Sequence, residues 1–404
     1  MLGLTVFGCS KKKEEGTAQK SDPAMTPKTT EPPPKQEPPP PAPLTGAALA
    51  DKYKACVDLV NAGKLDDFKK DCVADSYTGH AVAGMPEVKG ADAMIAWMKD
   101  MKTAMPDWKL APQLVIVSGR TILAVNLVTG THTGTMKSPM GDVPATNKKV
   151  GHLMFHRLAI NEQNKATDEW VYADGMTMMG QLGLLPKGAR PVRPVMEKGM
   201  DGAPIVVVTA DDAKEKANFD IVRKGNDAFL ANKPADLMAT FTDDAVEMDQ
   251  SAEKDAKGKK ELEKGMTTFR NGWSDVKMSN NEMWAAGDYV VQSFKFEGKN
   301  DKDIGKMKKT GKTVGIDAVE IMHFKDGKID QIWRFMNGAD FAMQMGMMPA
   351  PATKAGELKQ DAKEIGKDIK EGAKDVGKDV KAGAKEVGKD VKEGAKDVKD
   401  AVKK

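Results

Sequence analysis

Apolar positions follow a helical period at the start of the folded part of the chain and a period of two further on. Residues 49–60, 65–72 and 91–104 carry apolar side chains three or four positions apart, which predicts three helices. Four later segments, rich in β-branched and other apolar residues and joined by turns, are predicted to be strands: 114–117, 121–128, 149–158 and 167–172. Helices followed by strands joined by turns are typical of an α+β domain with an antiparallel sheet.

The same order of elements returns in the second half of the chain. Helices are expected near 219–230 and 260–269, with a short helix between them, and four strands follow that end at Phe335. Two pairs of tryptophans keep this order at offsets of 165 and 163 residues: Trp108 with Trp273, and Trp170 with Trp333. Landmarks in one order at a nearly constant offset indicate a tandem duplication.

Composition separates the two expected domains from the segments around them. Ten of the 22 prolines fall between Pro23 and Pro43, and such a segment favours extended polyproline II rather than a core. No aromatic residue occurs after residue 357, so the last segment cannot form a core alone. We therefore expect a signal remnant (1–9), a proline-rich linker (10–44), a first domain (45–195), a linker (196–214), a second domain (215–350) and a tail (357–404).

The overall charge excludes one class of partner. The formal net charge is only +3, and no basic segment is interleaved with aromatic residues, so nucleic acid is not expected to bind. No apolar run reaches the ~20 residues that a membrane-spanning helix needs.

The first residues resemble the end of a bacterial lipoprotein signal. A short apolar stretch leads into Gly8, Cys9 and Ser10, and three lysines and the proline-rich linker follow. The resemblance implies a lipid on Cys9 and a place in the bacterial envelope, at the outer membrane facing the periplasm or the surface. The apolar stretch is short and no basic region precedes it, so a stray cysteine in a disordered tail is the alternative.

Two cysteines remain if Cys9 carries a lipid. Cys56 and Cys72 lie on what are predicted to be consecutive helices. Outside the cytoplasm they could form an intrachain disulfide. Two buried free thiols are an equally good interpretation, because cysteine is often a small core residue.

Both halves carry motifs of one family. The first half contains the Gly-Thr-His-Thr-Gly string at 130–134, then Trp170 and Gln-Leu-Gly at 181–183, and the second half contains an Asp-Gly turn at 326–327 before Trp333. Both resemble the SnoaL-like polyketide and ester cyclase branch of the nuclear-transport-factor-2-like superfamily. The resemblance implies two cone-shaped domains, each a curved antiparallel sheet packed on helices around a small-molecule pocket, with no metal or other cofactor.

The resemblance also implies an acid/base residue, usually aspartate, three positions before a basic residue. In the first half, counting back from Arg157 gives Met154, which cannot exchange a proton near neutral pH. His80, His132 and His152 match pocket positions of the family. Histidines without a carboxylate favour a binding pocket or packed histidines over a reactive site, and they lack the spacing of recognised metal ligands.

In the second half the acid/base position, three residues before His323, holds Glu320. The three histidine positions hold Phe296, Ala318 and Asp249 instead. Strand alternation places Glu320 on an otherwise apolar face, and a carboxylate alone among apolar side chains is hard to ionise, which would suit a base. The alternatives are that this face is solvated or that Glu320 pairs with a lysine.

The tryptophans of the last strand of each half, Trp170 and Trp333, could line the pockets, although packing is the more common role of such residues. The two domains could pack on each other through their sheets, as dimers of the superfamily do.

The tail repeats every 11 residues from Ala362, and its apolar residues form one narrow stripe on a helix. The pattern resembles late-embryogenesis-abundant stress proteins. The stripe could bind a membrane or a second copy of the chain, or the tail could be solvated with no partner.

These features predict an envelope-anchored, non-catalytic protein that binds a small apolar or carbonyl-containing ligand. One alternative is a cyclase- or isomerase-type enzyme that abstracts a proton next to a carbonyl with Glu320 as base. The other is a stress-related structural protein of the envelope that acts through its tail.

Overall fold

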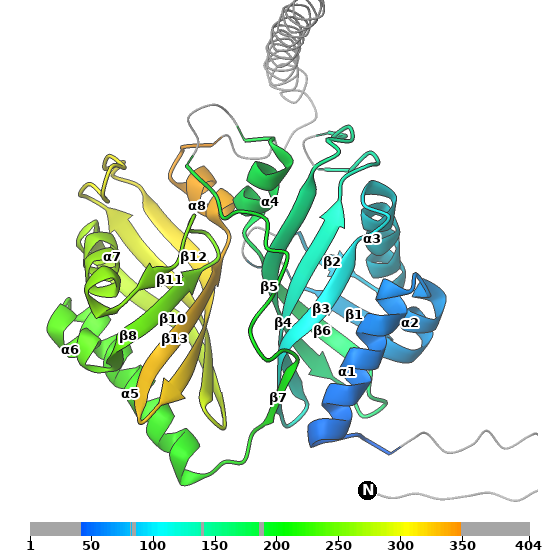
Figure 1. Cartoon of the computed structure of the whole chain (residues 1–404), viewed down its shortest axis with the longest axis horizontal. Coiled ribbons are helices and arrows are strands. Elements are labelled where there is room, and N and C mark those ends of the chain that lie inside the picture. The colour runs from blue at the N-terminus through cyan, green and yellow to red at the C-terminus, as the bar shows by residue number, and fades with distance from the viewer. Residues whose placement is uncertain (1–41, 81, 83–85, 139–140, 186–189, 349–404) are drawn as a thin grey trace, which may run out of the picture. The chain divides into compact units, whose positions relative to one another are not determined.

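The structure is a computed structural model that describes residues 42–80, 82, 86–138, 141–185 and 190–348 (Figure 1). It contains two domains that follow each other along the chain, each made of helices and one sheet. Cys9, most of the proline-rich linker and the tail at 357–404 lie outside the described residues. Within the described ranges, no helix is both long and apolar enough to cross a membrane.

The helices of the first domain follow the predicted periodicity. α1 (Gly46–Asn61), α2 (Leu65–Cys72) and α3 (Ala91–Ala104) occur where the apolar spacing places them, and a short α4 (Gly175–Leu182) comes later, before the last strand of the domain. Along α1, Leu49, Tyr53, Val57 and Val60 are buried, three or four positions apart, and face the sheet. Burial of this single stripe fixes the helix on the concave side of the sheet.

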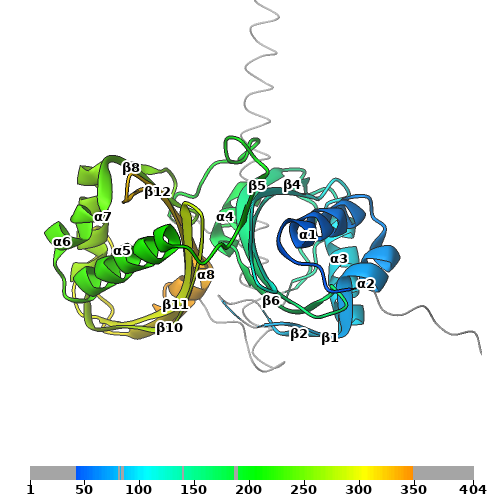
Figure 2. The same ribbon diagram turned by 90° about the horizontal axis from the view of Figure 1, so that it is seen from below.

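The sheet of the first domain has seven strands in the order β2-β1-β6-β5-β4-β3-β7. They are β1 (Val73–Gly79), β2 (Val88–Lys89), β3 (Lys109–Ser118), β4 (Thr121–Thr131), β5 (Lys149–Ile160), β6 (Ala166–Tyr172) and β7 (Ile205–Val208). Neighbours are antiparallel except for β1 with β6 and β3 with β7, which are parallel. Figure 2 shows this sheet curling around α1 and α3.

The expected linker at 196–214 is partly wrong, because β7 belongs to the first domain. Ile205 pairs with Leu114 of β3, and Val208 pairs with Val117. Ile205 and Val207 pack into a buried cluster, whereas Val206 and Val208 are exposed. By pairing with the edge strand β3, these four apolar residues form backbone hydrogen bonds and bury every second side chain. A linker that ran through solvent would do neither.

The second domain repeats the arrangement with a six-stranded sheet in the order β10-β11-β12-β13-β8-β9. Its helices are α5 (Ala213–Leu230), α6 (Pro234–Ala239), α7 (Lys259–Asn271) and α8 (Gly338–Gln344). Its strands are β8 (Phe241–Asp249), β9 (Ala256–Lys257), β10 (Trp273–Ala286), β11 (Tyr289–Asn300), β12 (Thr313–Lys325) and β13 (Lys328–Met336). The predicted α+β class and the tandem duplication are confirmed.

A glutamine on the last helix of each domain brackets a glycine at the start of a strand. Gln181 of α4 accepts from the backbone N–H of Gly151 at 3.0 Å and donates to its carbonyl at 2.9 Å. Gln344 of α8 makes the same two bonds to Gly315, both at 2.8 Å. A side chain at position 151 would lie 2.2 Å from the carbonyl oxygen of Met196, so only glycine fits there. This bracket explains why both halves keep the glutamine of the Gln-X-Gly motif, while the glycine of the motif takes a positive φ just after the helix.

The two sheets pack on each other through their outer faces. Phe155 and Tyr172 of the first domain share one buried cluster with Tyr289, Trp333 and Phe335 of the second. The rings of Phe155 and Phe335 have centroids 5.9 Å apart. Because the concave face of each sheet is also covered by helices, central strands are buried on both sides.

A cation–aromatic stack closes the rim of this contact. The guanidinium of Arg157 lies 4.2 Å from the ring centroid of Trp170 and 4.8 Å from that of Trp284 in the other domain. It also forms an ion pair with Glu282. Such contacts add specificity to the alignment of the two sheets.

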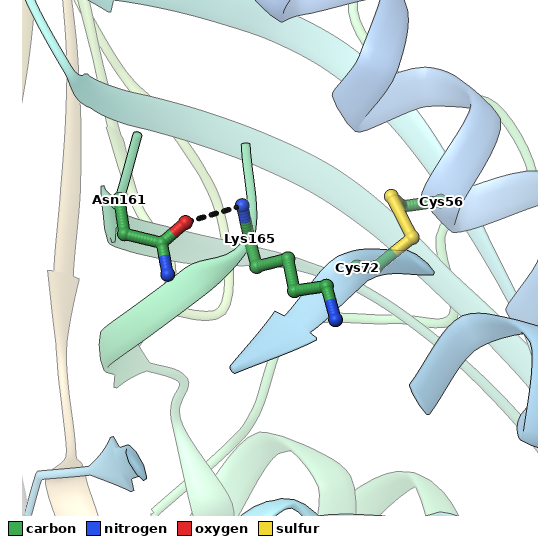
Figure 3. Close-up of a disulfide and its surroundings, with 4 residues drawn as sticks. All are labelled: Cys56, Cys72, Asn161 and Lys165. Carbon is green, nitrogen blue, oxygen red and sulfur yellow. Dashed lines mark hydrogen bonds between the residues drawn. A yellow bond between two sulfur atoms is a disulfide. The ribbon is translucent and has the colours of Figure 1, made fainter. Parts of the chain in front are cut away.

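Cys56 and Cys72 form a disulfide that joins α1 to the end of α2 (Figure 3). The two sulfur atoms lie among buried residues, with both cysteines exposed by less than a tenth. Of the two interpretations of this cysteine pair, the structure favours the disulfide. In the same view, the Asn161 side chain accepts a hydrogen bond from the backbone N–H of Lys165 at 3.0 Å across the turn between β5 and β6.

Replacing both Cys56 and Cys72 by alanine is expected to lower the free energy of unfolding by about 3 kcal/mol, because the bond spans 16 residues and restricts the unfolded chain. Urea unfolding measures the loss. Reduced wild-type protein serves as the control and should match the double variant. Equal stability of oxidised and reduced protein would contradict the expectation.

Candidate functional site

The backbone defines which strand residues correspond between the two domains. Counted from the bracketed glycines at the start of β5 and β12, Glu320 corresponds to His156, and Ala318 corresponds to Met154. The sequence-based assignment that paired Glu320 with Met154 is therefore wrong by two residues. It failed because it counted from the nearest basic residue, and the basic residues of the two strands stand at different positions.

Two further correspondences also differ from the sequence-based ones. The backbone of His132 exchanges hydrogen bonds with residues 147–148, and the backbone of Asn300 makes the same bonds to 311–312. Asn300, not Phe296, thus occupies the position of the first-strand histidine. Both positions are fully buried next to the loop that follows the strand.

The first strands of the two domains align through a shared backbone bond. Tyr77 and Ala245 each accept a hydrogen bond from the glycine that precedes the next helix. His80 therefore corresponds to Met248, and Asp249 lies one position beyond it. The expected exchange of His80 for Asp249 is wrong by one residue, although each side chain lines the cavity of its own domain.

The first domain encloses a cavity of about 140 Å³ between its helices and the concave face of its sheet. Its walls are mostly apolar, and they include Val57, Met94, Trp97, Met98, Ile122 and Leu158. Cys56 and Cys72 belong to the same lining. Among the polar side chains in the lining, three are joined by hydrogen bonds: Tyr77, His156 and Glu169.

These three side chains form one hydrogen-bonded chain across three strands. Nδ1 of His156 lies 2.6 Å from Oε1 of Glu169, and the Tyr77 hydroxyl donates to Oε2 of Glu169 at 2.5 Å. Burial alone would raise the pKa of Glu169. The hydrogen bond with His156, the charge of His156 and the hydrogen bond from Tyr77 outweigh burial and hold this pKa below its ordinary value. Burial and the Glu169 charge raise the pKa of Tyr77. Nε2 of His156 is buried and has no hydrogen-bond partner among the described residues.

The histidines predicted for this pocket separate in the structure. His80 lines the cavity, stacks on Trp170 with centroids 4.2 Å apart, and holds Asp168 at 2.8 Å. His132 and His152 do not line this cavity. Burial lowers the pKa of both, to about 4 for His152, so both are neutral near pH 7. Trp170 faces the other domain and the Arg157 stack rather than the cavity.

The second domain encloses a larger cavity, of about 560 Å³. Its apolar wall comes from α5, α7 and the concave face of the sheet, and it includes Phe229, Met266, Phe296, Ile316, Ala318 and Met322. Phe296 and Asp249, predicted as pocket residues, both belong to this lining. The alternation predicted for β12 is confirmed, since Glu320 also faces this cavity.

One end of this cavity is polar and is organised around Arg334 of β13. Its Nε donates to Oε1 of Glu320 at 2.8 Å, and its Nη1 forms ion pairs with Glu247 and, at 4.0 Å, with Asp249. Gln292 donates to the other oxygen of Glu320 at 2.6 Å. The expectation of a carboxylate alone among apolar side chains is therefore wrong, because both oxygens of Glu320 have partners.

The charges at this end do not balance. Burial opposes the charge on Arg334, but its three carboxylate neighbours outweigh that effect and raise its pKa. Burial raises the pKa of Glu247, Arg334 lowers it, and the charges of Asp249 and Glu320 raise it again, so the net shift is upward. Glu247 therefore holds a proton more readily than an ordinary glutamate does.

Trp333 does not belong to this cavity. It lies one residue before Arg334 on β13, so its side chain points to the opposite face, into the inter-domain cluster, where it is 3 % exposed. Its assignment to the ligand pocket is wrong for that reason. The described residues also contain no group of three or more His, Cys, Asp or Glu side chains arranged to hold a metal ion.

The chain belongs to the SnoaL-like polyketide cyclase family, whose model matches residues 49–182 and 220–345, more than half of the sequence. No curated protein matches it. Among similar solved structures is a protein assigned as a SnoaL-like polyketide cyclase from Jannaschia sp. CCS1, with 14 % identity over 35 % of this chain and 99 % of the other, and a TM-score of 0.33. TsrD from Streptomyces laurentii has 15 % identity over 34 % of this chain and 100 % of its own, with a TM-score of 0.31. An NTF2-like protein from Burkholderia pseudomallei K96243 has 12 % identity over 32 % of this chain and 97 % of its own, with a TM-score of 0.28. Each spans one domain of this chain at most.

Proposed function

We propose that the second domain binds a small, largely apolar molecule in its cavity. The observation that carries the proposal is a cavity of about 560 Å³ with apolar walls and one polar end. Ligand sites in proteins usually occupy ~300–1,000 Å³ and combine such walls with a few polar groups that orient the ligand. The membership in the SnoaL-like family supports a small-molecule ligand.

The polar end favours a ligand with a carbonyl group. Glu247, the acid with the raised pKa, lines the cavity and can donate a hydrogen bond to a carbonyl oxygen in its neutral form. Arg334 is held by its carboxylate neighbours, so it orients them and does not offer a free charge. A carbonyl compound with an apolar body therefore fits the site.

The same geometry favours binding over proton transfer by Glu320. Arg334 and Gln292 each donate a hydrogen bond to one of its two oxygens, which holds the carboxylate in the cavity wall as a hydrogen-bond acceptor. Binding uses this arrangement as it stands, whereas the cyclase-type alternative would have to move a proton onto a group that two donors hold in its acceptor form.

We further propose that the domains are tethered to the bacterial envelope through a lipid on Cys9. The apolar stretch before Cys9 and the proline-rich linker after it support this placement. The Cys56–Cys72 disulfide adds support, because such bonds persist in oxidising compartments. The tail at 357–404 would then contact the membrane or a second copy of the chain through its apolar stripe, a hypothesis that rests on its 11-residue pattern alone.

A thermal-shift screen of the full chain against apolar carbonyl compounds tests the binding proposal. A ligand at 100 times its Kd stabilises the folded protein by about 2.7 kcal/mol, which raises the melting temperature by several degrees. Ala318→Phe places a ring inside the cavity and should abolish this shift. Leu158→Phe alters the cavity of the first domain and should leave it intact. A panel that shifts neither the wild type nor the control would refute the proposal.

A further inference from the structure

The polar end of the second-domain cavity is covered by the segment between β8 and β9, residues 249–255. Four residues of this segment line the cavity: Asp249, Ser251, Ala252 and Lys254. Lys254 is also exposed, so the cavity reaches the surface beside this segment. A molecule that enters the cavity there has to pass residues 249–255.

Side chains of the first domain hold the backbone of this segment. Nη2 of Arg193 donates to the carbonyl oxygen of Asp249 at 2.8 Å. Nη1 of Arg190 donates to the carbonyl oxygen of Ser251. Arg193 also forms an ion pair with Asp255, at the other end of the segment, at 2.7 Å. Hydrogen bonds from a charged donor are stronger than neutral ones, so these contacts restrain the segment at both ends.

The two arginines are themselves fixed in the first domain. The N–H of Met196 donates to the carbonyl of Gly151 in β5 at 2.8 Å, which ties the chain that carries the arginines to the first sheet. The carboxylate of Asp174, at the start of α4, accepts from Arg190 at 2.8 Å and from the N–H of Gly338 in α8 at 2.8 Å. The helices α4 and α8 lie side by side where the domains meet (Figure 1). The hold on residues 249–255 therefore comes from a well-anchored part of the first domain.

The burial of Arg193 shows what this contact adds. Its side chain is 8 % exposed, and its Nε has no hydrogen-bond partner among the described residues. A buried charge is costly, and an apolar side chain would fill the same space without that cost. The apolar cluster between the sheets already joins the two domains. What the arginine contributes beyond packing is its set of bonds to residues 249–255.

We propose that the first domain controls access to the cavity of the second. Arg190 and Arg193 hold residues 249–255 across the open end of the cavity, and the cavity admits a molecule when these bonds are released. Arg193 is the main positioning residue, because it bonds both ends of the segment. The inference rests on the proposed function, since access matters only to a cavity that takes up a ligand, but its test needs no ligand.

The rate at which a cysteine in the cavity of the full chain reacts with N-ethylmaleimide measures this access. Ala318 lies on the cavity wall and is 5 % exposed, so Ala318→Cys should react slowly. Adding Arg193→Met should raise the rate about tenfold or more, the factor that loss of one hydrogen bond to a charged group contributes. Mass spectrometry of the peptide that contains residue 318 gives this rate separately from that of any other cysteine.

Two controls separate access from a general loss of stability. Arg120→Met removes a different arginine, which donates to backbone carbonyls within the first domain, and should leave the rate at residue 318 unchanged. Ala285→Cys places a thiol at a buried position of the second domain that does not line the cavity. This thiol should stay unreactive when Ala285→Cys is combined with Arg193→Met.

Equal rates at residue 318 with and without Arg193→Met would overturn the proposal. An equal rise at residue 285, or in Arg120→Met, would overturn it as well, because the effect would then not belong to the open end of the cavity. If Arg193→Met does not fold, Arg193→Lys takes its place. Lysine keeps the charge but lacks the fork that bonds Asp249 and Asp255 together, so the rate should still rise severalfold, and an unchanged rate would count against the proposal.

Discussion

Replacing Arg334 by methionine is expected to lower the free energy of unfolding by about 3–5 kcal/mol. Methionine retains most of the volume but leaves Glu247, Asp249 and Glu320 at the end of a cavity without their cation. Removal of one partner from a buried ion pair is costly because the remaining charge is neither solvated nor neutralised. Here three carboxylates share that partner, so the loss should fall in the upper part of the range.

The loss should depend on pH in a predictable direction. Without Arg334 the carboxylates of the folded protein have raised pKa values, as burial and mutual repulsion already cause at Glu247. A group whose pKa is raised by folding favours the folded state below its unfolded pKa, and that contribution is lost as pH rises through the folded pKa. The deficit of Arg334→Met should therefore be smaller at pH 5 than at pH 8.

Urea unfolding at both pH values measures these effects. Arg223→Met is the matched control, because Arg223 pairs with Asp220 on the surface and both side chains are more than half exposed. Surface pairs contribute little, so this variant should lose less than about 1 kcal/mol. If the two variants lost the same free energy of unfolding, or if the loss in Arg334→Met were larger at pH 5 than at pH 8, the description of Arg334 and its three carboxylates would be contradicted.

Replacing Phe335 by alanine is the second substitution with a large expected effect, about 3–5 kcal/mol. Phe335 is fully buried between the two sheets and contacts Phe155 of the first domain. Because both domains contribute to this cluster, the cavity left by the ring weakens both. The wild type should unfold in one transition, and the variant should unfold earlier or in two steps.

Calorimetry of wild type and Phe335→Ala distinguishes these outcomes. Phe219→Ala, a half-buried ring inside the second domain, is the control and should cost less than half as much. Loss of second-domain stability alone in Phe335→Ala, with the first domain unchanged, would show that the sheet-to-sheet contact does not couple the domains.

The sequence predicted the helices and most strands because their side chains bury one face. α1 and α3 follow the apolar stripe, and the buried positions of β12 alternate from Val314 to Ala318. β7 was missed because four residues are too short for a periodic pattern. Its place in the sheet depends on β3, which precedes it by about ninety residues.

The assignment of strand faces was harder, because both faces of the central strands are buried. Along β3, Val115 and Val117 face the helices, while Leu114 and Ile116 face the other domain. A run of apolar residues then gives no indication of which face lines a cavity. Trp333 was placed in a pocket for this reason, although it packs between the sheets.

The polar network of the first domain was missed because it forms across strands. Tyr77 and Glu169 meet through the parallel pairing of β1 with β6, and His156 joins them from β5. A signal was present in the sequence, since alternation places Glu169 on the face opposite Trp170. A carboxylate on an inward face is a candidate site residue, but only the pairing of the strands shows its partners.

The central claim is that the cavity of the second domain binds a small, largely apolar molecule. Native mass spectrometry of the full chain, purified gently from bacteria that produce it, tests this claim most directly. The account predicts an additional mass of a few hundred daltons or less that is retained in Leu158→Phe and lost in Ala318→Phe. Protein that carries no additional mass, and acquires none when incubated with apolar carbonyl compounds, would contradict it.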